Sequence, residues 1–188
     1  MTRIKMFTVL FMIFSPEQAS LKSRVFRELI SYLIERKEIG RMESKLNEIE
    51  NVIEGWKIDE SGIEEMYLSA ISGLEAVGNE RSLYDIYMKF IVRVGYNKKH
   101  IPIAERAIKL ALHSSSSNST TFDTLYNSRY VQEMKKENTQ LFQAFEIFVM
   151  KEFKDWVKIS DKFVKDLNLN KEKCDQKLKY LTICSLAQ

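Results

Sequence analysis

Five lysines in the last quarter of the chain could contact nucleic acid. They are Lys151, Lys154, Lys158, Lys162 and Lys165. Along a helix predicted over residues 152–167 they gather on one side, where ammonium groups could follow a phosphate backbone and release counterions. Four carboxylates are interleaved with them, at Glu152, Asp155, Asp161 and Asp166. We therefore expect a solvated outer face, with direct RNA or phosphate contact as the alternative hypothesis.

The residue types that most often do catalytic or metal chemistry are few and poorly spaced. His100 lies beside a predicted turn and His113 at a predicted helix end, and neither is spaced from Cys174 as a metal ligand would be. Cys184 lies within a predicted helix without a basic neighbour, so we expect it to be a small packed residue. Neither G-x-x-x-x-G-K nor G-x-G-x-x-G occurs. We expect no catalytic residue, no metal and no cofactor.

Composition favours one helical core or a short array of stacked helices. The 188 residues are 45% hydrophobic and 29% charged, which excludes a disordered chain, and six glycines with two prolines are too few for a many-turned β fold. The net charge of +3 does not by itself indicate nucleic-acid binding. Two cysteines, ten residues apart on one predicted helix, do not form a disulfide framework, so we expect a reduced, cytoplasmic location.

The apolar run from Met6 to Phe14 has two interpretations. Because Arg3 and Lys5 precede it and small residues follow, it has the outline of a signal peptide. The run is too short to span a bilayer, and Pro16 starts the next helix well. We expect the run to be a buried helix end, and we expect no membrane association.

Glycines divide the N-terminal part into predicted helices. Gly40, Gly55, Gly78 and Gly95 each follow apolar residues at three- and four-residue spacing, and we expect each to end a helix. Ser61 and Glu64 have capping-box spacing before the third of these helices. The distances from the first glycine to the third and from the second to the fourth are near 40 residues, which is typical of helical repeats. Residues 1–113 are therefore predicted to form a short all-α solenoid of helical hairpins.

The C-terminal part has a different composition. We expect a helix from Pro102 to about His113 and a Ser-rich loop over residues 114–121. Further helices are predicted at about 120–135, 139–150, 152–167 and 171–187. Aromatic residues recur at helical spacing and are expected in the core, at Phe142, Phe145, Phe148, Phe153 and Trp156, as are Tyr84, Tyr87 and Phe90.

Residues 173–187, KCDQKLKYLTICSLA, resemble the helix that leads into the winged helix of PCI-domain proteins, where K-[LM]-[KR]-x-L-T-x-x-[SG]-[LM]-A recurs. Two families share this pattern: subunit m of eukaryotic translation initiation factor three and subunit seven of the COP9 signalosome. Three upstream stretches are similar to the initiation-factor family, namely Phe122 to Leu125 followed by Val131 and Gln132, Leu141 to Phe148, and Phe163 to Cys174. A weaker similarity surrounds Ile53 to Trp56. The resemblance covers nearly the whole chain, but its specific motifs lie within residues 120–187.

This resemblance implies a scaffold protein and not an enzyme. The expected partners are the other subunits of translation initiation factor three, and through them the small ribosomal subunit. Residues 122–188 would be the helical part of a PCI domain, and we expect the winged helix to be missing because the sequence stops where it should begin. The chain also begins at what resembles the last helix of an earlier repeat, whose apolar end another subunit would cap. The alternatives are a scaffold subunit of the COP9 type, a basic helical RNA-binding module, and an enzyme without a recognisable motif.

Overall fold

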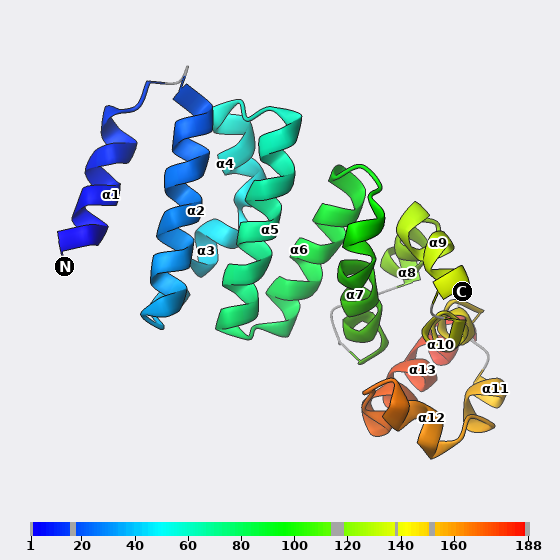
Figure 1. Ribbon diagram of the computed structural model, residues 1–188. Helices are drawn as coiled ribbons and strands as arrows, with labels where there is room; N and C mark the ends of the chain where they lie inside the picture. Colours follow the sequence, from blue (N-terminus) through cyan, green and yellow to red (C-terminus); the bar gives the residue numbers. More distant parts are fainter. Residues whose placement is uncertain (1, 16–17, 114–118, 138, 151–152, 187–188) are drawn as a thin grey trace. The chain divides into compact units, whose positions relative to one another are not determined.

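The structure is a computed structural model that describes residues 2–15, 18–113, 119–137, 139–150 and 153–186 (Figure 1). Every regular element within these ranges is helical, which confirms the all-α prediction. The chain divides into two compact units, Met1–Ile86 and Tyr87–Gln188. The expected division into residues 1–113, 114–121 and 122–188 stays a prediction.

The first unit consists of helices that lie side by side. Its elements are α1 (Thr2–Ile13), α2 (Ala19–Glu35), the 3-10 helix η2 (Ile39–Met42), α3 (Glu43–Asn47), α4 (Ile49–Trp56), α5 (Glu60–Val77) and the first part of α6 (Glu80–Arg93). Helix α2 packs against α1 and α5, and the short helices α3 and α4 also pack on α5 (Figure 1). Apolar side chains from α3, α4 and α5 are fully buried between them, at Leu46, Ile49, Met66, Ala70 and Leu74.

Helices end at or just before two of the four expected glycines, Gly78 and Gly95, and of these Gly78 alone has a left-handed backbone. Gly78 ends α5 with a left-handed backbone, φ 79°, and its N–H donates to the carbonyl of Leu74. Gly40 instead lies within η2, and Gly55 within α4. Lysines adopt the left-handed conformation in their place: Lys37 at φ 58° follows α2, and Lys57 at φ 53° follows α4. The prediction was wrong at these two positions because non-glycine residues can adopt this conformation at a cost that the surrounding packing offsets.

The start of α5 also differs from the prediction. Asp59 caps the helix, and its Oδ1 accepts a hydrogen bond from the Gly62 N–H at 2.9 Å. Ser61, expected to be the cap, lies inside the first turn. Both Asp and Ser are good N-caps, and Asp59 is the residue whose extended backbone suits the position. At the fourth glycine, α6 ends at Arg93, and Gly95 follows without a left-handed backbone.

In the second unit, other helices pack around α7. After the end of α6 its elements are η3 (Lys98–His100), α7 (Ile101–His113), α8 (Ser119–Tyr126), α9 (Arg129–Glu137), α10 (Thr139–Met150), α11 (Phe153–Val157), α12 (Asp161–Asp166) and α13 (Lys171–Leu186). Helix α7 packs against α9, α10 and α13. Its bounds, and those of α10 and α13, lie within about one residue of the predicted ones.

Two predicted helices of this unit are each divided by a serine. The helix expected at 120–135 is broken at Ser128, whose Oγ accepts from the Val131 N–H at the start of α9. The helix expected at 152–167 is broken before Ser160, whose Oγ accepts from the Phe163 N–H at the start of α12. Serine side chains compete with the helical backbone for hydrogen bonds and favour caps. The predicted Ser-rich loop lies mostly outside the described residues. At residues 119–121 the prediction of a loop was wrong, because α8 begins at Ser119.

The expected aromatic core is confirmed for all but one member. Phe142, Phe145, Phe148, Trp156, Tyr84 and Phe90 are at most 1% exposed, Tyr87 is 2% exposed, and Phe153 is half-buried. Phe122, which the spacing did not single out, stacks on Phe145 with ring centroids 5.5 Å apart. Trp156 meets Phe148 edge to face at 5.0 Å and donates from Nε1 to Asp175 at 2.6 Å, which joins α11 to α10 and α13.

Candidate functional site

The structure does not align the predicted lysine face along one helix. Lys154 lies in α11 and Lys158 just after it, whereas Lys162 and Lys165 lie in α12 beyond the break at Ser160. These four side chains are exposed. Lys151, the fifth member, lies outside the described residues. The shared face was predicted from an uninterrupted helix, so that geometric premise was wrong.

Carboxylates neutralise part of this basic surface. The Lys158 ammonium lies 2.6 Å from Asp155 Oδ1. Asp161, at the start of α12, pairs with Lys171 of α13. The hydrogen bond from Lys171 and its charge lower the pKa of Asp161, and the same hydrogen bond raises the pKa of Lys171. Exposed pairs of this kind add little to stability, but they give the surface a mixed charge in place of a continuous basic track.

The histidines and cysteines lie in different surroundings. His100 is 4% exposed and meets the ring of Phe90 edge to face at 5.1 Å. Cys174 is fully buried, and burial raises the pKa of its thiol to about 12. Cys184 is half-buried in α13, and the side chain of His113 lies outside the description. Within the ranges that the structure describes, no group of three or more His, Cys, Asp or Glu residues could hold a metal ion.

Helix α1 has one buried side and one exposed apolar side, which its apolar sequence only partly predicted. Its inner side packs on α2, where Phe7 lies 6.1 Å from Tyr32 and Phe11 lies 6.5 Å from Phe26. Its other side carries three exposed apolar residues, Met6 at 60%, Val9 at 52% and Ile13 at 69%. We call these three residues the α1 outer face. The prediction that this run is buried is thus confirmed for the side of α1 that faces α2 and wrong for the α1 outer face.

An apolar pocket of about 420 Å³ lies beside this helix. Its aromatic lining is Phe11 of α1, Phe26 of α2 and Trp56 of α4, with Phe11 and Trp56 stacked at 5.6 Å. Phe26 meets Trp56 edge to face at 5.7 Å. Such ring pairs add stability beyond the area that they bury, so this cluster fixes α1 on α2 and α4 and keeps the α1 outer face turned away from them.

None of the described helices is long and apolar enough to cross a bilayer. The fold defines the class: an all-helical protein, with an exposed apolar face on α1 and a surface of mixed charge on α11 and α12. Its sequence is similar to eukaryotic translation initiation factor 3 subunit M of Pyricularia oryzae, with 24% identity over 154 residues. The alignment covers 78% of this chain and 36% of that relative, so the chain spans little more than a third of the relative's length. No family model matches the chain, and no solved structure does.

Proposed function

We propose that this protein is a non-catalytic scaffold subunit of translation initiation factor three, in the position of subunit M. The observation that carries this proposal is the similarity to that subunit over 78% of the chain. The all-helical fold is compatible with a short solenoid that leads into a PCI-type helical region. In this role the protein acts in the cytoplasm, contacts other subunits of the factor, and meets the small ribosomal subunit through them.

A scaffold subunit acts by binding other proteins. Protein interfaces have an apolar centre and a polar rim, and the α1 outer face fits this description because Lys5 lies exposed beside its three apolar residues. Exposed apolar residues that gather on one face of a helix are typical of interaction sites. We propose that an apolar helix of a neighbouring subunit covers the α1 outer face.

The test is affinity purification of the tagged full chain from its native cell, followed by identification of the chains that co-purify. The proposal expects subunits of translation initiation factor three. Recovery of deneddylase subunits would instead assign the protein to a COP9-type complex. Recovery of the protein alone would contradict both scaffold assignments.

A basic RNA-binding module is the alternative from a different class. Its support is the exposure of Lys154, Lys162 and Lys165 and the charge of the second unit, which holds 18 basic and 11 acidic residues. The pairing of Lys158 with Asp155 and of Asp161 with Lys171 weakens it, since RNA binding favours a continuous basic surface. We therefore place the scaffold role first.

A further inference from the structure

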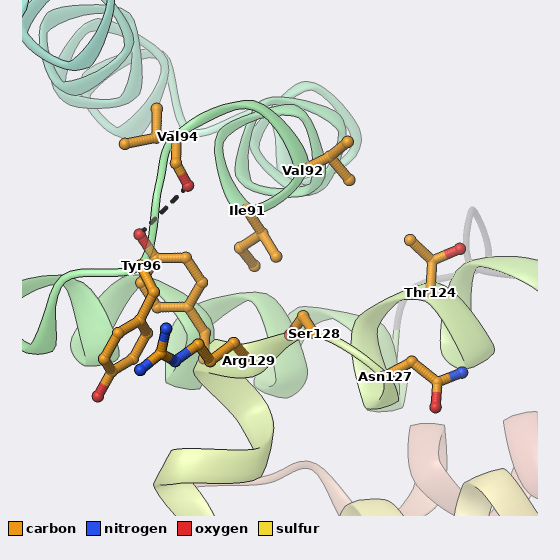
Figure 2. A pocket seen from close by; sticks show the side chains of 9 residues that line it. Ile91, Val92, Val94, Tyr96, Thr124, Asn127, Ser128 and Arg129 are labelled. Atoms are coloured by element: carbon orange, nitrogen blue, oxygen red, sulfur yellow. Dashed lines mark hydrogen bonds between the residues drawn. The ribbon is translucent and has the colours of Figure 1, made fainter.

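A second pocket lies wholly within the unit Tyr87–Gln188, where the end of α6 faces the corner between α8 and α9 (Figure 2). Its volume is about 430 Å³. One wall is aliphatic and consists of Ile91, Val92 and Val94, while the other carries polar groups from the α8–α9 corner. Val92 is 69% exposed at the rim, so a ligand could reach the aliphatic wall.

The charged group of this pocket is held in place before any ligand binds. The guanidinium of Arg129 lies over the ring of Tyr96, 4.7 Å from its centroid (Figure 2). Tyr96 in turn lies 5.2 Å from the ring of Tyr130. Tyr130 is 2% exposed, and its hydroxyl donates to the Gly95 carbonyl at 2.7 Å. A pre-positioned arginine loses less conformational entropy on binding a carboxylate than a freely moving one does.

Arg129 has charge available for a ligand. Within the described ranges no carboxylate forms an ion pair with it at salt-bridge distance. Glu133, one turn further along α9, pairs with Lys136 at 3.0 Å. The hydrogen bond from Lys136 and its charge lower the pKa of Glu133, and the charge of Arg129 adds to this effect. The excess of basic residues in this unit adds a positive field. The pocket therefore favours an anion, and its aliphatic wall favours an apolar group beside that anion.

We infer that this pocket binds a short acidic peptide segment of a partner protein, with an Asp or Glu side chain on Arg129 and a neighbouring Leu, Ile or Val side chain against Ile91 and Val92. A carboxylate can accept two parallel hydrogen bonds from a guanidinium, which gives the contact its direction. Asn127 lines the polar wall, and its side-chain amide both donates and accepts hydrogen bonds. This inference goes beyond the proposed function, because it depends on the pocket and not on which complex contains the protein.

Nucleic acid fits this pocket less well. A base would need an open aromatic face, but Arg129 and Tyr130 both lie against Tyr96. The pocket offers one arginine and an aliphatic wall in place of a row of cations. RNA binding is therefore an outcome of the test and not part of the proposal.

The test uses an array of hexapeptides, each with one Asp or Glu beside one Leu, Ile or Val, and matched peptides with Asn or Gln in place of the acid. The fluorescently labelled full chain should bind a subset of the acidic peptides about tenfold more tightly than their amide counterparts, since a charge-assisted hydrogen bond is lost in the amide. Arg129→Gln should remove this preference. Arg106→Gln is the matched control, because Arg106 also lies over a tyrosine ring, Tyr87, but does not line the pocket.

A second pair of variants tests the aliphatic wall. Val92→Asp should lower binding of the same peptides about tenfold by repelling the carboxylate and removing apolar contact. Val157→Asp, at a similarly exposed position in α11, should not. Circular dichroism checks that each variant folds. Equal binding of acidic and amide peptides, or unchanged binding by Arg129→Gln, would overturn the inference. So would binding of a labelled oligouridylate that depends on Arg129 in the absence of peptide binding. Co-purification of initiation-factor subunits bears on the proposed function alone.

Discussion

The charged side chain of Lys177 is buried in the interior of the second unit. The side chain is 7% exposed, and its ammonium lies 5.9 Å from the ring centroid of Phe122. Burial disfavours the charged form, so the pKa of Lys177 falls below its ordinary value of 10.5, although the nearby Cys184 thiol opposes this shift. The ring of Phe122 offsets part of the cost by a cation–π contact.

This burial predicts a pH-dependent effect of Lys177→Met. As the pH rises toward 10.5, the folded protein loses the Lys177 proton before the unfolded chain does, so the cost of burying the charge decreases. The variant should gain most in free energy of unfolding at neutral pH, and its advantage should shrink as the pH approaches 10.5. Urea unfolding at a series of pH values measures this difference. The exposed Lys173→Met is the control, and a constant advantage of Lys177→Met at every pH would refute the explanation.

The two thiols should differ in reactivity. Because burial raises the pKa of Cys174 to about 12 and closes access to it, almost no reactive thiolate is present at pH 8. A disulfide reagent should therefore label Cys184 in the folded protein and reach Cys174 only after unfolding. The rate of labelling of Cys184→Ser in native buffer is the measurement. Fast labelling of this variant would show that Cys174 is not enclosed as described.

At the scale of elements, the close packing of α5 on α3 depends on Gly73. A Cβ atom added there would come within 2.7 Å of Leu46 Cδ1, and Ile30 and Ile39 lie at 3.5 and 3.6 Å. Leu46 has little room to yield, since it is fully buried. Overpacking of a core commonly costs more than the helix propensity that alanine adds.

We expect Gly73→Ala to lower the free energy of unfolding by about 1 kcal/mol. Gly55→Ala is the matched control: it also lies within a helix, but nothing lies within 4 Å of its added Cβ, so this change should stabilise by about 0.5 kcal/mol. Chemical denaturation measures both. Stabilisation by both substitutions would mean that α3 and α5 are not in close contact at this point.

The basic surface of α11 and α12 gives a further prediction at this scale. Replacing Lys154, Lys158 and Lys162 by Glu should leave retention on immobilised RNA unchanged, because these lysines lie on separate segments and Lys158 already pairs with Asp155. The control, with the same change in net charge, replaces the exposed Lys45, Lys57 and Lys99. Selective loss of retention in the first variant would favour the RNA-binding alternative.

The spacing of apolar residues predicted where the helices lie but not where they are interrupted. Apolar spacing located α7, α10 and α13 because each has one long buried face. The division of α11 from α12 depends on a hydrogen bond from the Phe163 N–H to Ser160, and apolar spacing does not reveal such competition. The pocket at Arg129 was not predictable from spacing, because residues 91–96 and 124–130 meet only in the folded unit.

At the scale of the whole molecule, the proposed scaffold role depends on a surface that remains apolar and exposed in the folded chain. Phe7 and Phe11 fix α1 to its neighbours, which leaves Met6, Val9 and Ile13 facing outward. Substitutions on this outer side should leave the folded protein intact, because they remove none of the ring contacts. Their effect should appear in assembly, since a charge placed in the apolar centre of an interface is costly.

The most direct measurement is sedimentation of the tagged full chain in an extract of its native cell, for the wild type and for Val9→Asp combined with Ile13→Asp. The wild type should sediment with a large complex containing initiation-factor subunits, and the double variant, though folded, should move to the light fractions. Val157→Asp, an exposed position in the other unit, should stay with the complex. Wild-type protein found only in the light fractions, or a double variant that stays with the complex, would contradict the account.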